Sequence, residues 1–121
     1  MTIRECYERL NGDFDDAVDR LGSERLVGKF MLRFSDEGER CMQALRDAVA
    51  AGDIEESFRA SHALKGLAAN LSFTAFAEKA AELCDALRPL EAPADPSVME
   101  ELEARFRRVL DALESYRAET A

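Results

Sequence analysis

Apolar residues recur at alternating spacings of three and four along most of the chain, a pattern typical of helices that pack side by side. The segments that carry it are 2–10, 14–21, 24–51, 54–71, 73–88 and 96–118. In the third segment the core face is predicted to hold Val27, Met31, Phe34, Cys41, Leu45 and Val49. The polar residues 35–40 interrupt this stripe and predict a solvated or bent turn. No segment alternates with the period of two that marks strands, so we predict an all-α fold, an antiparallel up-and-down four-helix bundle whose end is capped by two short N-terminal helices.

Residues that stop and start helices stand between these segments. Each stop contains a glycine and is followed at once by a residue suited to the N-cap of the next helix. These pairs are Asn11-Gly12 with Asp13, Gly22 with Ser23, and Gly52 with Asp53. Glu56 is placed to complete a capping box with Asp53, and Asp95 before Pro96 is placed to start the last helix. All three prolines fall in one short window, which predicts a single long loop over residues 89–95.

Composition and charge narrow the possible partners. The 121 residues are 47% hydrophobic, which is enough for one core and a single domain over residues 1–121. The 25 acidic and 16 basic side chains give a net charge of -9, which repels nucleic acid and anionic membranes. No apolar run is long enough to span a bilayer, and the N-terminus has no signal-peptide core. Cys6, Cys41 and Cys84 have no paired spacing, so we interpret them as small core residues with reduced thiols in a cytoplasmic protein.

The chain contains one histidine, His62, within the predicted helix 54–71. At about 100° per residue, the apolar stripe of this helix is centred roughly 130° away from His62, so the imidazole is expected to point to solvent. An exposed imidazole is largely neutral at cytoplasmic pH and can attack a phosphoryl group through a ring nitrogen. We assign the chemistry to His62 and Lys65, and the docking of a partner to four residues on the same face: Phe58, Arg59, Gly66 and Ala69.

Lys65 and Gly66 distinguish this face from that of an ordinary surface histidine. Lys65 lies one helical turn from His62, where its ammonium can stabilise the charge of a phosphorylated ring. A glycine inside a helix costs about 1 kcal/mol relative to alanine, and we interpret Gly66 as clearance for the active site of a partner. The alternatives are a surface histidine without a role, a solvated charge at Lys65, close helix packing at Gly66, and a core position for Phe58.

Four stretches of the chain are similar to one known family. They are Leu10-Asn11-Gly12-Asp13-Phe14, His62-Ala63-Leu64-Lys65-Gly66, Ala68-Ala69-Asn70-Leu71 and Glu82-Leu83-Cys84. In these stretches, and over nearly its whole length, the chain resembles the histidine-containing phosphotransfer domains of bacterial two-component phosphorelays. It departs from the family at Ser72, where the family usually has glycine. We expect Ser72 to cap the next helix itself and to leave the fold unaffected.

The resemblance implies a four-helix bundle whose His62 accepts a phosphoryl group from the aspartate of one receiver domain and passes it to another. The partners it implies are receiver domains of hybrid histidine kinases and response regulators, which bring the aspartate and its bound Mg²⁺. We expect no cofactor, no metal site, no ATP binding and no autokinase activity, because the chain has no cluster of metal ligands and no glycine-rich phosphate loop. The expected form is a cytoplasmic monomer.

Two other interpretations stay open from the sequence. The first is a helical adaptor that docks a receiver domain through the same face without taking phosphate. The second is an input phosphotransfer module of a chemotaxis-type kinase. A chain that begins at Met1 and ends at Ala121 favours a free-standing protein over such a module.

Overall fold

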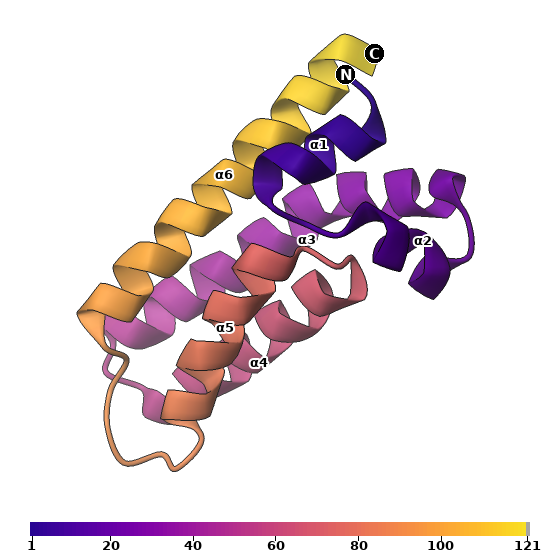
Figure 1. Ribbon diagram of the computed structural model, residues 1–121. Helices are drawn as coiled ribbons and strands as arrows, with labels where there is room; N and C mark the ends of the chain where they lie inside the picture. Colours follow the sequence, from indigo (N-terminus) through magenta and orange to yellow (C-terminus); the bar gives the residue numbers. More distant parts are fainter. Residues whose placement is uncertain (121) are drawn as a thin grey trace.

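The computed structural model describes residues 1–120 and shows six helices and no strand in that range (Figure 1). The helices are α1 (Ile3–Leu10), α2 (Phe14–Leu21), α3 (Glu24–Ala50), α4 (Ile54–Asn70), α5 (Thr74–Leu87) and α6 (Pro96–Thr120). Every predicted segment therefore corresponds to one helix, and the largest difference, at the end of α6, is two residues. The prediction of an all-helical fold is confirmed.

The predicted helix starts are formed by side-chain caps. Asp13, Ser23 and Asp53 each accept a hydrogen bond from the backbone N–H three residues further along, which satisfies one of the free donors at a helix start. The capping box at α4 is only half formed, because the Glu56 carboxylate accepts a hydrogen bond from Arg59. The local sequence therefore determines where the helices start. Which hydrogen-bond partner a surface side chain such as Glu56 takes depends on the other side chains around it on the helix.

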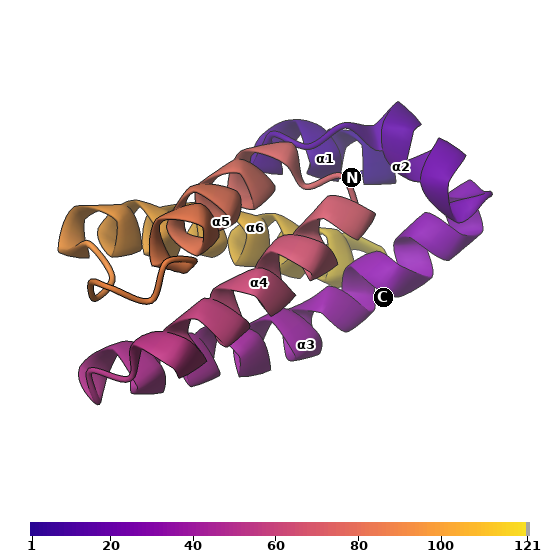
Figure 2. The same cartoon turned by 90° about the horizontal axis from the view of Figure 1, so that it is seen from below.

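Helices α3 to α6 form the bundle, and their order around it places the site. α4 packs between α3 and α5, and α6 packs against α5 and α3 (Figure 2). α4 and α6 are therefore diagonal neighbours, with opposite sides of the bundle exposed. The core between them is apolar and rich in aromatic rings, with Phe34, Phe73, Phe76 and Phe106 in contact with one another.

The two N-terminal helices cover the end of the bundle that holds the α4–α5 turn (Figure 1). The buried hydroxyl of Tyr7 on α1 donates a 2.7 Å hydrogen bond to the carbonyl oxygen of Leu71 at this turn. On its other side α1 rests on α6, where the Cys6 thiol donates to the carbonyl oxygen of Ala112, and burial raises the pKa of that thiol to about 11. The terminal amino group of Met1 pairs with Glu119 at 3.2 Å. The predicted capping position is thus the observed one.

The apolar stripe of α3 is not interrupted at residues 35–40, where the sequence had suggested a break, and α3 is one continuous helix through them. Gly38 is buried in this stretch, and a Cβ atom on it would lie 2.8 Å from the ring of Phe34. Gly38 therefore occupies a core position that carries no side chain, so the stripe continues from Phe34 through Gly38 to Met42 in steps of four. This step moves Cys41 from the predicted core to a half-exposed position.

The α4–α5 turn also differs from its prediction. Ser72 does not cap α5, since Phe73 is the N-cap residue and makes no capping hydrogen bond through its side chain. Ser72 instead takes a left-handed backbone conformation with φ 54°, which glycine adopts without cost and other residues adopt at about 1–2 kcal/mol. Its hydroxyl donates to the Asp16 carboxylate at 2.6 Å, which lowers the pKa of Asp16 and offsets the strained backbone.

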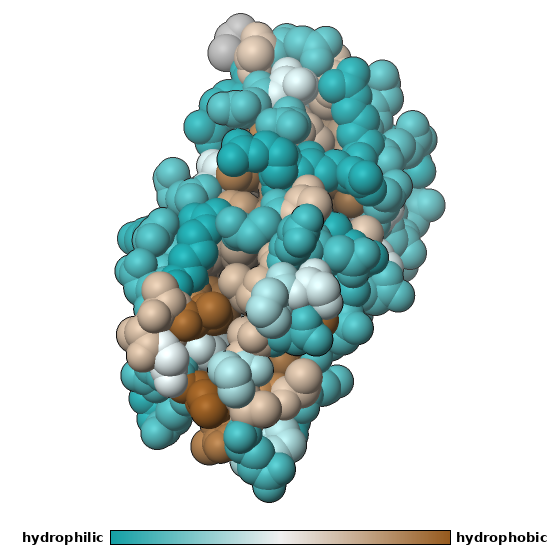
Figure 3. All heavy atoms as spheres, turned by 90° about the vertical axis from the view of Figure 1, so that its left-hand side faces the viewer, coloured by the Kyte–Doolittle hydropathy of each residue, from teal (hydrophilic) through white to brown (hydrophobic). Residues whose placement is uncertain are grey.

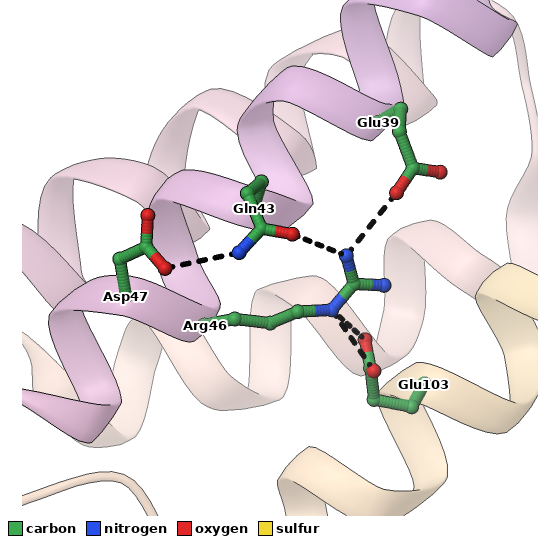
Figure 4. A network of polar contacts seen from close by, with 5 residues as sticks. All are labelled: Glu39, Gln43, Arg46, Asp47 and Glu103. Atoms are coloured by element: carbon green, nitrogen blue, oxygen red, sulfur yellow. Dashed lines mark hydrogen bonds and ion pairs between the residues drawn. The ribbon is translucent and has the colours of Figure 1, made fainter.

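A polar network on the bundle surface ties α3 to α6 (Figure 4). The Arg46 guanidinium donates through Nε to both carboxylate oxygens of Glu103, at 3.1 and 3.0 Å. It also donates to Glu39 and Gln43 on its own helix, and the bond to Glu103 raises the pKa of Arg46. These contacts fix how α3 and α6 lie against each other on the side away from α4.

The surface seen from the α6 side is mainly hydrophilic, with apolar side chains gathered toward the end that holds the 88–95 loop (Figure 3). Leu90 in this loop is the large apolar residue with the highest exposure, at 47%. In residues 1–120, no helix combines the length and the apolar character that crossing a membrane requires.

Candidate functional site

His62 lies on the exposed face of α4, as predicted. The opposite face of α4 is buried and carries the small or apolar side chains of Ser57, Ser61, Leu64 and Ala68. The two serine hydroxyls donate to carbonyl oxygens of their own helix, at 2.7 and 2.8 Å, so that they can be buried without an unsatisfied group. The packing of this face against the core holds His62 outward.

The imidazole of His62 is held on two sides by neighbouring side chains. Phe58, one turn earlier on α4, stacks on it with ring centroids 6.1 Å apart and 26° between the planes. The Nδ1 atom lies 3.9 Å from the Sγ atom of Cys84, a fully buried residue of α5. Because Nδ1 faces a buried thiol, the other ring nitrogen, Nε2, lies on the outward side of the ring.

The sequence analysis did not identify two residues of this site, Cys84 and Arg88 of α5. Cys84 was interpreted only as a small core residue, and Arg88 was not singled out. The Arg88 guanidinium lies over the Phe58 ring at 5.4 Å and 3.9 Å from the Cys84 thiol. The sequence does contain a signal for both residues. The short turn makes α4 and α5 antiparallel about Phe73, so residues at equal sequence distances from Phe73 are expected to lie opposite each other. His62 and Cys84 are equally distant from Phe73 in sequence, and so are Phe58 and Arg88.

The cations near His62 differ in how far they are already engaged. Arg59 pairs with Glu56 and Glu55 on its own helix, and these contacts, chiefly that with Glu56, raise its pKa. Arg88 makes a longer ion pair with Asp85, at 3.4 Å. Lys65 is half exposed and makes no ion pair within residues 1–120. Of these cations, Lys65 is therefore the one whose charge is available to a ligand of His62.

Gly66 opens onto a groove between α3 and α4. The groove has a volume of about 680 Å³ and is lined by Glu37, Arg40, Cys41, Ala63, Gly66, Leu67 and Asn70. A Cβ atom on Gly66 would meet no atom within 4 Å apart from its chain neighbours and the backbone of its own helix. Close helix packing at Gly66 is therefore excluded, and open space beside His62 is what the glycine provides. Ala69, two turns beyond His62, is half-buried.

We expect the variant Gly66→Gln to fold as stably as the parent, or about 0.5 kcal/mol more stably, because glutamine is the better helix former. Its side chain projects into the groove beside His62 and, in the transfer that the sequence resemblance implies, should slow phosphoryl acceptance from a receiver domain about tenfold, the scale of an overpacked contact. Thermal melting and a transfer assay measure the two effects. The control Gly66→Ala should gain about 1 kcal/mol and keep its transfer rate. A destabilised Gly66→Gln protein that accepts phosphate at the parent rate would contradict the clearance interpretation.

Within residues 1–120, no three His, Cys, Asp or Glu side chains are grouped so that they could hold a metal ion.

Comparison with known proteins gives one match. The family model described as Hpt domain matches residues 29–116, which include most of α3, all of α4 and α5, and most of α6. The comparisons with curated proteins and with solved structures gave no match. The matched range contains every residue discussed at the site, including those on α5.

Proposed function

The chain belongs to the Hpt domain family, and on this basis we propose that it is a phosphorelay intermediate in which His62 carries the phosphoryl group. The family supports a role in histidine phosphotransfer. The observation that carries the assignment to His62 is that the only histidine of the chain is exposed, with its Nδ1 atom turned toward a buried thiol. We propose a receiver aspartate of a hybrid histidine kinase as the donor and a response-regulator aspartate as the acceptor.

In the proposed transfer, Nε2 of His62 acts as the nucleophile. Its lone pair attacks the phosphorus of the aspartyl phosphate, the N–P bond forms, and the bond from phosphorus to the aspartate oxygen breaks. The electron pair of the broken bond leaves with the aspartate as a carboxylate. The ring keeps its proton on Nδ1, 3.9 Å from the Cys84 sulfur, which is a weak acceptor. Transfer to the response regulator reverses these bonds.

The cations around His62 support the same proposal. A phosphoryl group on Nε2 brings negative charge to the outward side of the ring, one turn from Lys65, while Arg88 lies over the Phe58 ring and near the Cys84 thiol. The receiver domain supplies its own aspartate and Mg²⁺, so this chain has to supply only a nucleophile and a docking face. The open groove beside Gly66 gives a partner access to that face.

We place the exchange in the cytoplasm. Cys6, Cys41 and Cys84 are all free thiols, a state that reducing compartments maintain.

The direct test is to incubate the chain with a phosphorylated receiver domain and to follow the label. Label that is stable to alkali and lost in acid, as expected for phosphohistidine, supports the proposal. A receiver domain that binds the chain in a pull-down while the chain stays unlabelled would show an adaptor instead. Receiver domains with the aspartate replaced by asparagine serve as the control, since they dock but have no phosphoryl group to give.

Cys84 should act as a positioning residue for His62. We expect Cys84→Ala to slow phosphoryl acceptance about two- to tenfold, the value of one neutral hydrogen bond. Cys84→Ser keeps a polar atom at the same place and should restore most of the rate. Single-turnover transfer measures the rates, and nitrogen NMR of the imidazole should show fewer molecules with the proton on Nδ1 in Cys84→Ala than in the parent. If Cys84→Ala and Cys84→Ser both kept the transfer rate and the tautomer population of the parent, this role of Cys84 would be refuted.

A further inference from the structure

A second groove lies on the other side of the bundle, between α1 and α6. It has a volume of about 400 Å³ and is lined by Arg9, Ala104, Arg107, Arg108, Asp111, Ala112 and Ser115. We call this surface the arginine groove. α6 is diagonal to α4 in the bundle, so the arginine groove and the His62 face open on different sides of the molecule (Figure 2).

The three arginines of this groove have no acidic partner. Arg9, Arg107 and Arg108 are all exposed, and none of them makes an ion pair within 4.0 Å in residues 1–120. Elsewhere in the described part of the chain some arginines are paired, such as Arg20 and Arg46, and others, such as Arg25 and Arg40, are not, but here three unpaired arginines line one groove together. The three positive charges therefore lie together in one groove without forming ion pairs within residues 1–120.

We propose that the arginine groove docks a short acidic segment of a partner protein. The guanidinium group presents donors in a fork that matches a carboxylate, which suits recognition of glutamate and aspartate side chains. The lining runs from Ala104 to Ser115, about 16 Å along α6 at 1.5 Å per residue, which accommodates several residues of a peptide. The Asp111 carboxylate within the groove accepts a hydrogen bond from a backbone N–H or a hydroxyl of the bound segment. Its negative charge repels a further acidic group at that point.

The net charge of the whole chain decides between an acidic protein segment and other anions. At -9, the molecule repels nucleic acid and anionic membranes, whose charge extends far beyond a groove of this size. A single phosphate ion would occupy only one part of the lining and would leave the remaining arginines unpaired. A short segment with several spaced carboxylates can pair with all three while the rest of its chain avoids the acidic surface.

The arginine groove does not depend on the chemistry of His62. Because the two surfaces face different sides, one partner can stay bound at α6 while another exchanges a phosphoryl group at α4. The test below measures binding alone, so its failure leaves the proposed phosphotransfer intact, and a failure of phosphotransfer leaves this proposal intact.

The test uses fluorescence anisotropy of a short fluorescein-labelled peptide of alternating glutamate and alanine. We expect the parent chain to bind it, and the affinity to fall as salt shortens the screening length from about 30 Å at 0.01 M to about 8 Å at 0.15 M. The triple variant Arg9→Gln/Arg107→Gln/Arg108→Gln should bind at least about tenfold more weakly. The matched control Arg25→Gln/Lys29→Gln/Arg33→Gln removes the same charge from α3 and should bind like the parent.

Three results would overturn the proposal. The first is a groove variant that binds the peptide as tightly as the parent, and the second is an equal loss in the α3 control, which would show an effect of net charge only. The third is an arginine-dependent response to inorganic phosphate or to phosphatidylserine vesicles in the absence of peptide binding. Thermal melting of both triple variants verifies that they are folded, because all six substituted side chains lie on the surface.

Discussion

Replacing His62 with glutamine should remove all phosphoryl label from the chain while leaving the fold intact. His62 is the only histidine, so no second imidazole can take its place. The side chain is exposed, and exposed substitutions usually change the free energy of unfolding by less than about 0.5 kcal/mol. Incubation with a phosphorylated receiver domain, followed by gel analysis of the label, measures the first effect, and thermal melting by circular dichroism measures the second.

The control for this experiment is Arg25→Gln, an exposed substitution on α3 that should leave both label and melting temperature unchanged. Label that persists on the His62→Gln protein would place the phosphoryl group on another residue. Loss of label together with loss of the helical signal would be inconclusive for the glutamine variant alone. In that case the test is repeated with His62→Asn, which has a smaller polar side chain. We expect this variant to be folded and unlabelled, as the assignment of the phosphoryl group to His62 requires.

The second large effect is expected at Lys65. Its ammonium makes no ion pair within the described residues and lies one turn from His62, so it is free to contact the phosphoryl oxygens. Lys65→Ala should slow transfer by roughly one to two orders of magnitude, which corresponds to the loss of a charge-assisted contact of about 1.5 to 3 kcal/mol. Single-turnover kinetics with excess receiver domain measures this rate, and the melting temperature should change little.

Arg59→Ala is a matched control for Lys65→Ala. Arg59 is another cation on α4 close to His62, but its guanidinium is already bound to Glu55 and Glu56. Its removal should therefore slow transfer much less than the removal of Lys65. An unchanged rate in Lys65→Ala would reduce Lys65 to a solvated charge, and equal slowing in both variants would point to net charge in place of a specific contact.

Much of the fold could be predicted from the sequence because its determinants are local. Helix starts at Asp13, Ser23 and Asp53 depend on a side chain and an N–H three residues away, and both are visible in sequence. The exposure of His62 follows from the angular position of one residue against the apolar stripe of its own helix. These predictions needed no knowledge of what the helices pack against.

The features that escaped prediction depend on neighbours from other parts of the chain. The contact of Cys84 with His62 joins two helices, and it requires the register that the α4–α5 turn imposes. Gly38 was taken for a polar break because a glycine carries no side chain, although the ring of Phe34 fills the space. Ser72 keeps a left-handed backbone through a bond to Asp16, a residue of α2 far earlier in the chain.

The packing of α1 on α6 has a consequence for how the chain folds during synthesis. α1 is made before the other described helices, yet the residues it covers, around Ala112, belong to α6, the last of them. The pairs α3–α4 and α4–α5 are close in sequence and can form as they emerge, whereas closing α1 onto α6 brings together residues 106 positions apart. Until α6 is complete, α1 lacks the part of its cover that α6 supplies, so a chain released early would expose that surface and be prone to aggregate.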